Sequence, residues 1–101
     1  MTSQDIWKTV LGEIELQISR PNFLTWLKQS ELVDKDEKNG VALVGLPNQF
    51  AKDWVKSRYH KLILGSLRNL DGTIRSIDYV VLFVMGFVVF AGVFVDGGVD
   101  G

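Results

Sequence analysis

Two prolines divide the chain and restrict its fold more than any other feature of the sequence. Pro21 disfavours helical geometry at the residue before it, so a first helix has to end near Ser19. The same proline fits the first turn of a second, short helix, where its missing amide costs nothing. Pro47, followed by Asn48, ends an extended segment and opens a further helix. The prolines therefore predict a first helix, a short second helix, and an extended segment that ends where a long helix begins.

The segments on either side of these prolines have helical periodicity. Thr2 or Ser3 can cap the first helix, and its apolar residues recur at helical spacing: Trp7, Val10, Leu11, Ile14 and Ile18. The second helix contains Trp26, and the third covers about residues 48–69 and contains Trp54. Because both tryptophans fall inside apolar stripes, we expect them to be buried together with Ile14.

Three segments have the pattern of strands. Ser30–Lys35 and Val41–Leu46 flank a polar stretch that ends in Asn39-Gly40, a pair typical of a tight hairpin turn. Thr73–Val81 alternates enough to form a third strand. The sequence predicts an α+β domain of order α-α-β-β-α-β, with a three-stranded sheet packed against the helices.

The composition changes abruptly near residue 81, so we divide the chain into a domain at 1–81 and an apolar tail at 82–101. Residues 79–95 carry no charge and are rich in Val and Phe, which favours strand over helix. The tail residues can nearly all be written with codons rich in G and T. A frameshift or read-through is therefore our first interpretation of the tail, membrane anchoring the second and a genuine extra strand the third.

The charged and sulfur-containing residues exclude several classes of function. The 101 residues have a net charge of −1, which argues against strong electrostatic binding of nucleic acid. The absence of cysteine fits a reducing cytoplasm, and the polar N-terminus lacks the pattern of a secretory signal. His60 is the only histidine, and the acidic residues do not cluster. We therefore expect no catalytic centre, no metal site and no cofactor.

Three separated motifs resemble the N-terminal domain (domain I) of the bacterial replication initiator DnaA. Residues 46–59, LPNQFAKDWVKSRY, resemble that family's PN-x-F-x-x-DWV-x-x-x-Y stretch. Residues 21–27, PNFLTWL, look like its P-x-F-x-x-W segment, and Trp7 occupies the matching position of the first helix. The resemblance covers about residues 3–81 and implies a compact fold related to KH domains.

The resemblance implies a non-catalytic module that assembles initiators at the origin and recruits the replicative helicase. It assigns self-association to Trp7 and helicase contact to Phe50 and to the position of Asn22, where family members often have an acidic residue. It also associates Asn48 with weak contact to single-stranded DNA. The chain contains no G-x-x-x-x-G-K-[ST] phosphate loop and no helix-turn-helix segment, so the family's ATPase and DNA-binding domains are missing from it.

Each of these residues also has a plainer structural interpretation. Periodicity places Trp7 in the core, although a ring in the first turn can project past the core edge as an interface anchor. Phe50 lies off the main stripe of its helix and is either a satellite core contact or an exposed anchor. Lys52, Lys56 and His60 share a helical face that is most simply a solvated one, although the lysines can assist a weak contact with single-stranded DNA.

Two rival functions belong to other classes. A small KH-like domain that binds single-stranded nucleic acid is one, but residues 1–81 lack the GXXG loop with which KH domains clamp the backbone. A small membrane-tethered protein is the other, although its apolar tail is short for a spanning helix. The sequence favours the docking and self-association module.

Overall fold

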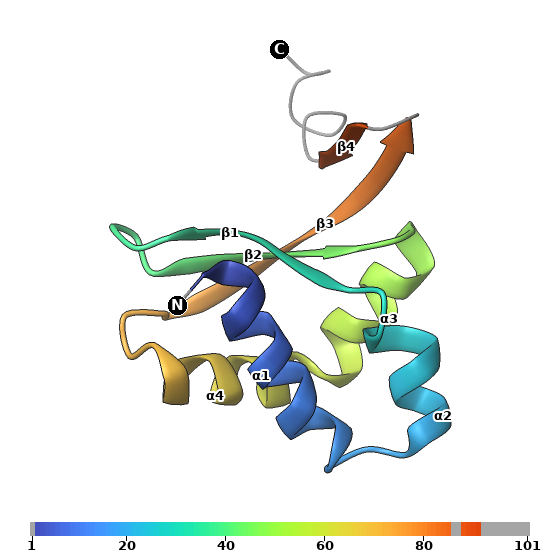
Figure 1. Ribbon diagram of the computed structural model, residues 1–101, viewed down its shortest axis with the longest axis horizontal. Coiled ribbons are helices and arrows are strands. Elements are labelled where there is room, and N and C mark those ends of the chain that lie inside the picture. Colours follow the sequence, from blue (N-terminus) through green and yellow to red (C-terminus); the bar gives the residue numbers. More distant parts are fainter. Residues whose placement is uncertain (1, 86–87, 92–101) are drawn as a thin grey trace.

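The computed structural model describes residues 2–85 and 88–91, which form an α+β fold as predicted. Figure 1 shows the helices on one side of the sheet. The elements in chain order are α1 (Ser3–Glu15), α2 (Arg20–Asn22), the π-helical turn η1 (Phe23–Leu27), β1 (Glu31–Asp36), β2 (Val41–Leu46), α3 (Gln49–Arg58), α4 (His60–Leu70), β3 (Ser76–Met85) and β4 (Val88–Ala91).

The first helix begins as predicted and ends earlier. The Thr2 hydroxyl accepts a hydrogen bond from the Asp5 amide, and the Asp5 side chain accepts one from the Thr2 amide, so the two residues form a capping box. The helix ends at Glu15, and the predicted end near Ser19 is wrong. Ser19 caps the next helix instead, because its hydroxyl accepts from the Asn22 amide.

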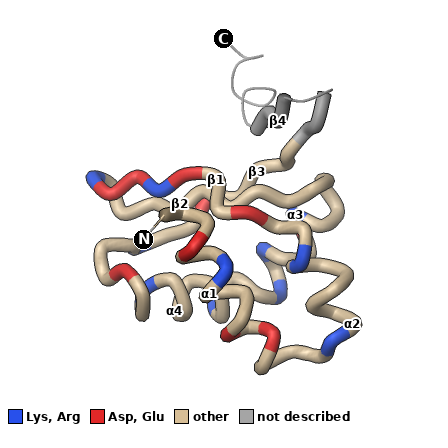
Figure 2. Tube along the Cα trace, in the orientation of Figure 1, with Lys and Arg blue, Asp and Glu red and all other residues tan. Residues whose placement is uncertain are grey.

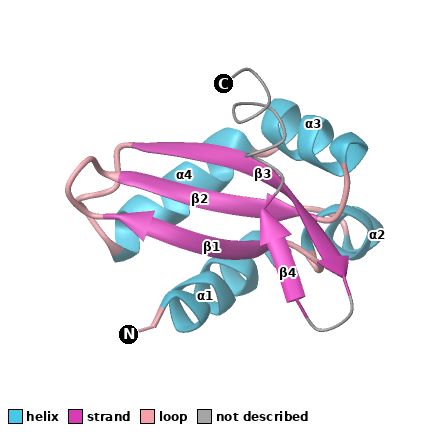
Figure 3. Ribbon diagram, turned by 90° about the horizontal axis from the view of Figure 1, so that it is seen from above, coloured by secondary structure: helices cyan, strands magenta, loops and turns pink. Residues whose placement is uncertain are grey.

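The sheet is mixed, and Figure 3 shows its strands from above. β1 pairs antiparallel with β2, while β2 pairs parallel with β3 from Val41↔Ser76 to Leu46↔Val81. The predicted three-stranded sheet is therefore confirmed. The third strand begins at Ser76 rather than at Thr73, because the amides of Arg75 and Ser76 both donate to the Gly40 carbonyl.

The hairpin turn requires glycine at one position. Gly40 has φ +70°, in the left-handed region, as predicted, whereas Asn39 does not have the positive φ that was expected of the pair. A Cβ atom at Gly40 would also lie 2.5 Å from the Thr73 carbonyl oxygen, so the loop before β3 packs directly against this backbone.

The long helix predicted over residues 48–69 is two helices. The chain breaks at Tyr59, which has φ −116° and ψ 5° and separates α3 from α4. The Tyr59 side chain is buried at this corner, and each helix lays its own apolar face against the core. α3 buries Ala51 and Val55, whereas α4 buries Ile63 and Leu67. The break therefore lets two short helices cover the sheet where one straight helix was expected.

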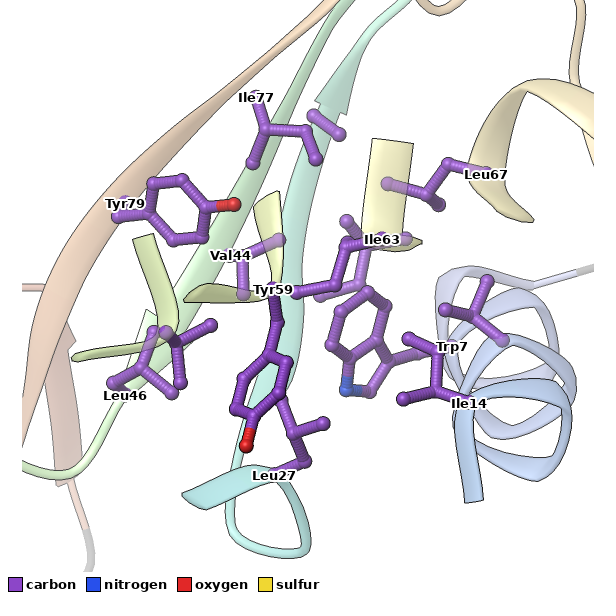
Figure 4. Packing of buried hydrophobic residues seen from close by; sticks show 14 of the residues in the cluster. Trp7, Ile14, Leu27, Val44, Leu46, Tyr59, Ile63, Leu67, Ile77 and Tyr79 are labelled. Carbon is purple, nitrogen blue, oxygen red and sulfur yellow. The ribbon is translucent and has the colours of Figure 1, made fainter. Parts of the chain in front are cut away.

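The core lies between the sheet and the helices, and Figure 4 shows part of it. Its fully buried large side chains are Val10, Ile14, Leu27, Val44, Leu46, Val55, Ile63, Leu67 and Ile74. Ile14 is therefore where the sequence placed it. Trp26 and Trp54 are only partly buried and pack against the outside of the core, so the prediction that all three are buried together is wrong for the tryptophans.

The predicted tail begins inside β3, which continues past Val81 to Met85. Leu82 to Met85 pair antiparallel with β4. Residues 86–87 and 92–101 lie outside the described residues, and the three interpretations of the tail stay predictions. Among the helices of the described residues, none is both long and apolar enough to cross a membrane.

Candidate functional site

The outer side of α3 carries three large side chains in a row. Phe50, Trp54 and Arg58 are spaced four residues apart, so they lie above one another on the helix surface. Asn48 starts the helix: its side-chain oxygen accepts from the Ala51 amide at 2.8 Å. Since Ala51 faces the core, this cap fixes where the row begins and directs Phe50 outward.

The π-helical turn η1 supplies a third aromatic ring. The Lys28 amide donates to the Phe23 carbonyl at 3.0 Å, the wide hydrogen bond that defines this turn. Phe23 and Leu27 point into the core, and Trp26 lies on the adjacent side, only partly buried. The turn thereby places Trp26 against α3.

We call Trp26, Phe50 and Trp54 the aromatic cluster. The rings of Trp26 and Trp54 stack with centroids 4.7 Å apart and an interplanar angle of 14°. Phe50 meets Trp26 edge-on at 5.4 Å and lies 6.3 Å from Trp54. Phe50 nevertheless remains 68% exposed. A large apolar ring held in place by two tryptophans yet open to water is the usual form of an anchor in a protein interface.

Two donor groups, from Arg58 and Trp54, lie at the cluster. The guanidinium carbon of Arg58 lies 4.5 Å from the centroid of the Trp54 ring. The indole Nε1 of Trp54 is shielded from solvent and has no hydrogen-bond partner. The carboxylate of Asp53, in contrast, already accepts from Gln49 Nε2 at 3.0 Å. An apolar partner that brings acceptor groups fits this surface.

The residues that the resemblance assigned to contacts are placed differently from one another. Phe50 belongs to the aromatic cluster. Asn22 is exposed and is the residue directly before η1. Asn48 is exposed, but its side-chain oxygen is engaged in capping α3. Lys56 is exposed and Lys52 is half-buried. Their contact roles stay predictions.

The sequence analysis missed Trp26 and Trp54 of the aromatic cluster and the neighbouring Arg58. Both tryptophans were assigned to the core, and the arginine was not singled out. The four-residue spacing of Phe50, Trp54 and Arg58 was the available signal, because it places both later residues on the side of the off-stripe phenylalanine.

Trp7 lies in the core instead of projecting past its edge. Its side chain is 4% exposed, and Figure 4 shows its ring directed into the buried cluster. The indole Nε1 donates to the carbonyl and to the hydroxyl of Ser30, at 3.1 and 3.2 Å. Trp7 thus joins α1 to the start of β1, beside a hollow of about 230 Å³ that Lys8 and Glu31 also line. A half-exposed anchor at Trp7 is therefore ruled out, while a role of this region in self-association stays a prediction.

His60 does not continue the row of Lys52 and Lys56, because the chain breaks at Tyr59. Its Nδ1 atom lies 2.9 Å from the Tyr79 hydroxyl, within hydrogen-bonding distance. Burial raises the pKa of Tyr79 well above its usual value, so the phenol stays protonated beside the histidine. Within residues 2–85 and 88–91, no three His, Cys, Asp or Glu side chains are placed to hold a metal ion.

The fold and this surface define a class: a small α+β domain that presents a rigid aromatic cluster and whose described residues hold no metal-binding group. The family model of the DnaA N-terminal domain matches residues 4–69, and the chain belongs to this family. The domain is non-catalytic and takes part in the initiation of DNA replication, through protein interactions. The matched segment includes every residue of the aromatic cluster.

Proposed function

We propose that this protein is a docking and self-association module that recruits the replicative helicase during initiation at the chromosomal origin, in the bacterial cytoplasm. The observation that carries the proposal is the exposed Phe50 ring, fixed against the stacked Trp26 and Trp54. Because the ring is already ordered, a partner that covers it gains apolar contact area with little loss of side-chain freedom.

The docking part of the proposal is tested with Phe50→Ala in the full chain. Binding of the cognate replicative helicase is measured by isothermal titration calorimetry or biolayer interferometry. We expect a loss of affinity of more than about tenfold, as for a central anchor. Since Phe50 is largely exposed, the variant should keep a free energy of unfolding within about 0.5 kcal/mol of the parent.

Leu16→Ala is the matched control, because it truncates a side chain that is 88% exposed and belongs to no part of the aromatic cluster. It should bind helicase like the parent. A folded Phe50→Ala protein that binds as tightly as the parent would remove the basis of the docking proposal.

Self-association through α1 is the second part of the proposal. Since Trp7 is buried, it contributes by holding α1 against the start of β1, and the contact itself falls to side chains around it, such as Gln4 and Lys8. Sedimentation of Lys8→Glu at several protein concentrations tests this: the charge reversal should weaken self-association without unfolding the domain.

A weak contact with single-stranded DNA is a second candidate function, favoured by the positive charge around the aromatic cluster. Lys52 and Lys56 lie on α3, and the side-chain amide nitrogen of Asn48 has no part in the helix cap. Lys52→Ala and Lys56→Ala should lower affinity for an oligothymidine and reduce its salt dependence, while changing helicase affinity much less than Phe50→Ala does.

A further inference from the structure

Arg58 forms the outer layer of a stack on α3. Trp26 lies parallel to Trp54 and so occupies one face of its ring. The guanidinium carbon of Arg58 lies over the same ring, 4.5 Å from its centre. Trp54 therefore contacts both a second indole and a guanidinium.

The Arg58 side chain is exposed, and its guanidinium carries five N–H donors in a planar fork. Among residues 2–85 and 88–91, Arg58 takes part in none of the ion pairs, which are Arg20–Glu15, Lys35–Glu37 and Lys35–Asp71. The only acid of α3, Asp53, accepts from Gln49. The domain thus orients a cationic fork and leaves it without a carboxylate of its own.

The surroundings of Arg58 are positive although the chain as a whole is slightly acidic. Residues 20–28 and 49–58, which carry the aromatic cluster, hold five lysine or arginine residues and one aspartate, a formal charge of +4 in a chain of net charge −1. Figure 2 shows blue segments along α2 and α3, whereas much of the red lies on β1 and its hairpin. The positive charge around the cluster therefore favours the approach of a negatively charged partner segment.

We propose that Arg58 recognises a carboxylate of the docked partner. The surface then binds a partner segment in which an acidic side chain stands next to an apolar one. The inference rests on the proposed docking function. The partner segment inserts its apolar side chain beside Phe50 and places an Asp or Glu on the free edge of the Arg58 guanidinium. Such a carboxylate forms two parallel N–H···O hydrogen bonds with the planar fork, which an ammonium cannot reproduce.

A nucleic-acid strand fits the stack less well than a protein segment. Single-stranded nucleic acids bind by stacking successive bases on open aromatic faces. The Trp54 ring is already stacked against Trp26, and the Arg58 guanidinium lies over it as well. Phe50 is the ring of the aromatic cluster that is largely open to a partner. A single open ring next to the Arg58 guanidinium suits a protein segment in which an apolar side chain is followed by a carboxylate.

The test compares Arg58→Gln and Arg58→Lys with the parent, each in the full chain and against the replicative helicase. Arg58→Gln should weaken binding by about tenfold or more and flatten its dependence on salt. Arg58→Lys keeps the charge but loses the planar fork, and should recover only part of the affinity. Arg68→Gln is the matched control: it neutralises an exposed arginine in the last turn of α4, outside the cluster, and should leave affinity within about twofold.

The outcomes separate this inference from the proposed function. If Phe50→Ala loses helicase and Arg58→Gln does not, the docking surface stands and the carboxylate contact is wrong. A fully active Arg58→Lys variant also overturns it, because the fork would then be unnecessary. If Arg58→Gln loses oligothymidine binding but keeps helicase, the ligand of Arg58 is a phosphate and the inference fails. If neither Phe50→Ala nor Arg58→Gln changes helicase affinity, both proposals fall.

Discussion

Truncation of Trp7 should unfold much of the domain rather than disturb a surface. The side chain is 4% exposed, and it joins α1 to the start of β1 through hydrogen bonds to Ser30. Trp→Ala in a packed core costs about 3–5 kcal/mol, because the transferred area is lost and a cavity remains. Small domains have a total stability near the lower end of about 5–15 kcal/mol. Trp7→Ala therefore removes most of the free energy of unfolding.

Trp7→Phe separates the two contributions. Phenylalanine keeps much of the buried ring but loses the N–H group, which leaves the Ser30 carbonyl without this donor. The Ser30 hydroxyl still donates to the Leu27 carbonyl at 2.5 Å, so the loss is confined to one donor. A buried acceptor without its partner costs about 1–3 kcal/mol. The expected order of stability is parent, Trp7→Phe, Trp7→Ala.

Urea unfolding followed by far-UV circular dichroism measures this order. With a urea slope of about 1–2 kcal/mol per M for a protein of this size, Trp7→Ala should lower the midpoint by roughly 1.5 M or more. Self-association is then measured by sedimentation, only under conditions in which each variant is folded. A Trp7→Ala protein with the parent's midpoint and no self-association would refute the reasoning, since Trp7 would then be a surface anchor.

Three further predictions concern charge and backbone. Hydrogen bonds from Lys35 and then from Thr73 hold the pKa of Asp71 at about 2, below its usual value of 3.8, so the stability it contributes is complete above pH 3.8 and is lost as the pH falls toward 2. In denaturation curves at a series of pH values, Asp71→Asn should flatten the acid side of the stability profile, and an unchanged slope would contradict this. Gly40→Ala should destabilise the domain by roughly 2 kcal/mol or more, because φ is +70° and the new Cβ would lie 2.5 Å from the Thr73 carbonyl oxygen. Gly12→Ala, with open space around its Cβ in α1, should stabilise it by roughly 0.5–1 kcal/mol in the same assay.

Local chemistry in the sequence was enough for the element boundaries that depend on single residues. Pro47 separated β2 from α3 correctly, and Gly40 marked the turn that it makes, whereas Pro21 lies inside α2 and did not fix the end of α1 at Glu15. The break at Tyr59 carries no such mark, because neither glycine nor proline occurs there. It follows from the burial of the tyrosine ring at the corner between α3 and α4, a tertiary contact that periodicity does not contain.

The sequence predicted only part of the candidate site, because part of it also depends on tertiary contacts. Phe50 was singled out because it lies off the apolar stripe of its helix. Trp26 and Trp54 lie at the edges of their stripes, where periodicity does not distinguish a buried ring from a half-buried one. The π-helical turn that brings Trp26 against Trp54 has no sequence signal that we could identify.

The parallel pairing of β2 with β3 has a consequence for how the chain folds. β1 and β2 form a local hairpin, but Val41 pairs with Ser76, so β2 can acquire its second neighbour only after the residues that carry α3 and α4 have been synthesised. Contacts of this sequence separation carry a loop-closure cost and form late. During synthesis from the N-terminus, β3 is also the last strand of this sheet to leave the ribosome. We therefore expect a period in which the inner edge of β2 is unpaired, and in which one nascent chain can capture another through that edge.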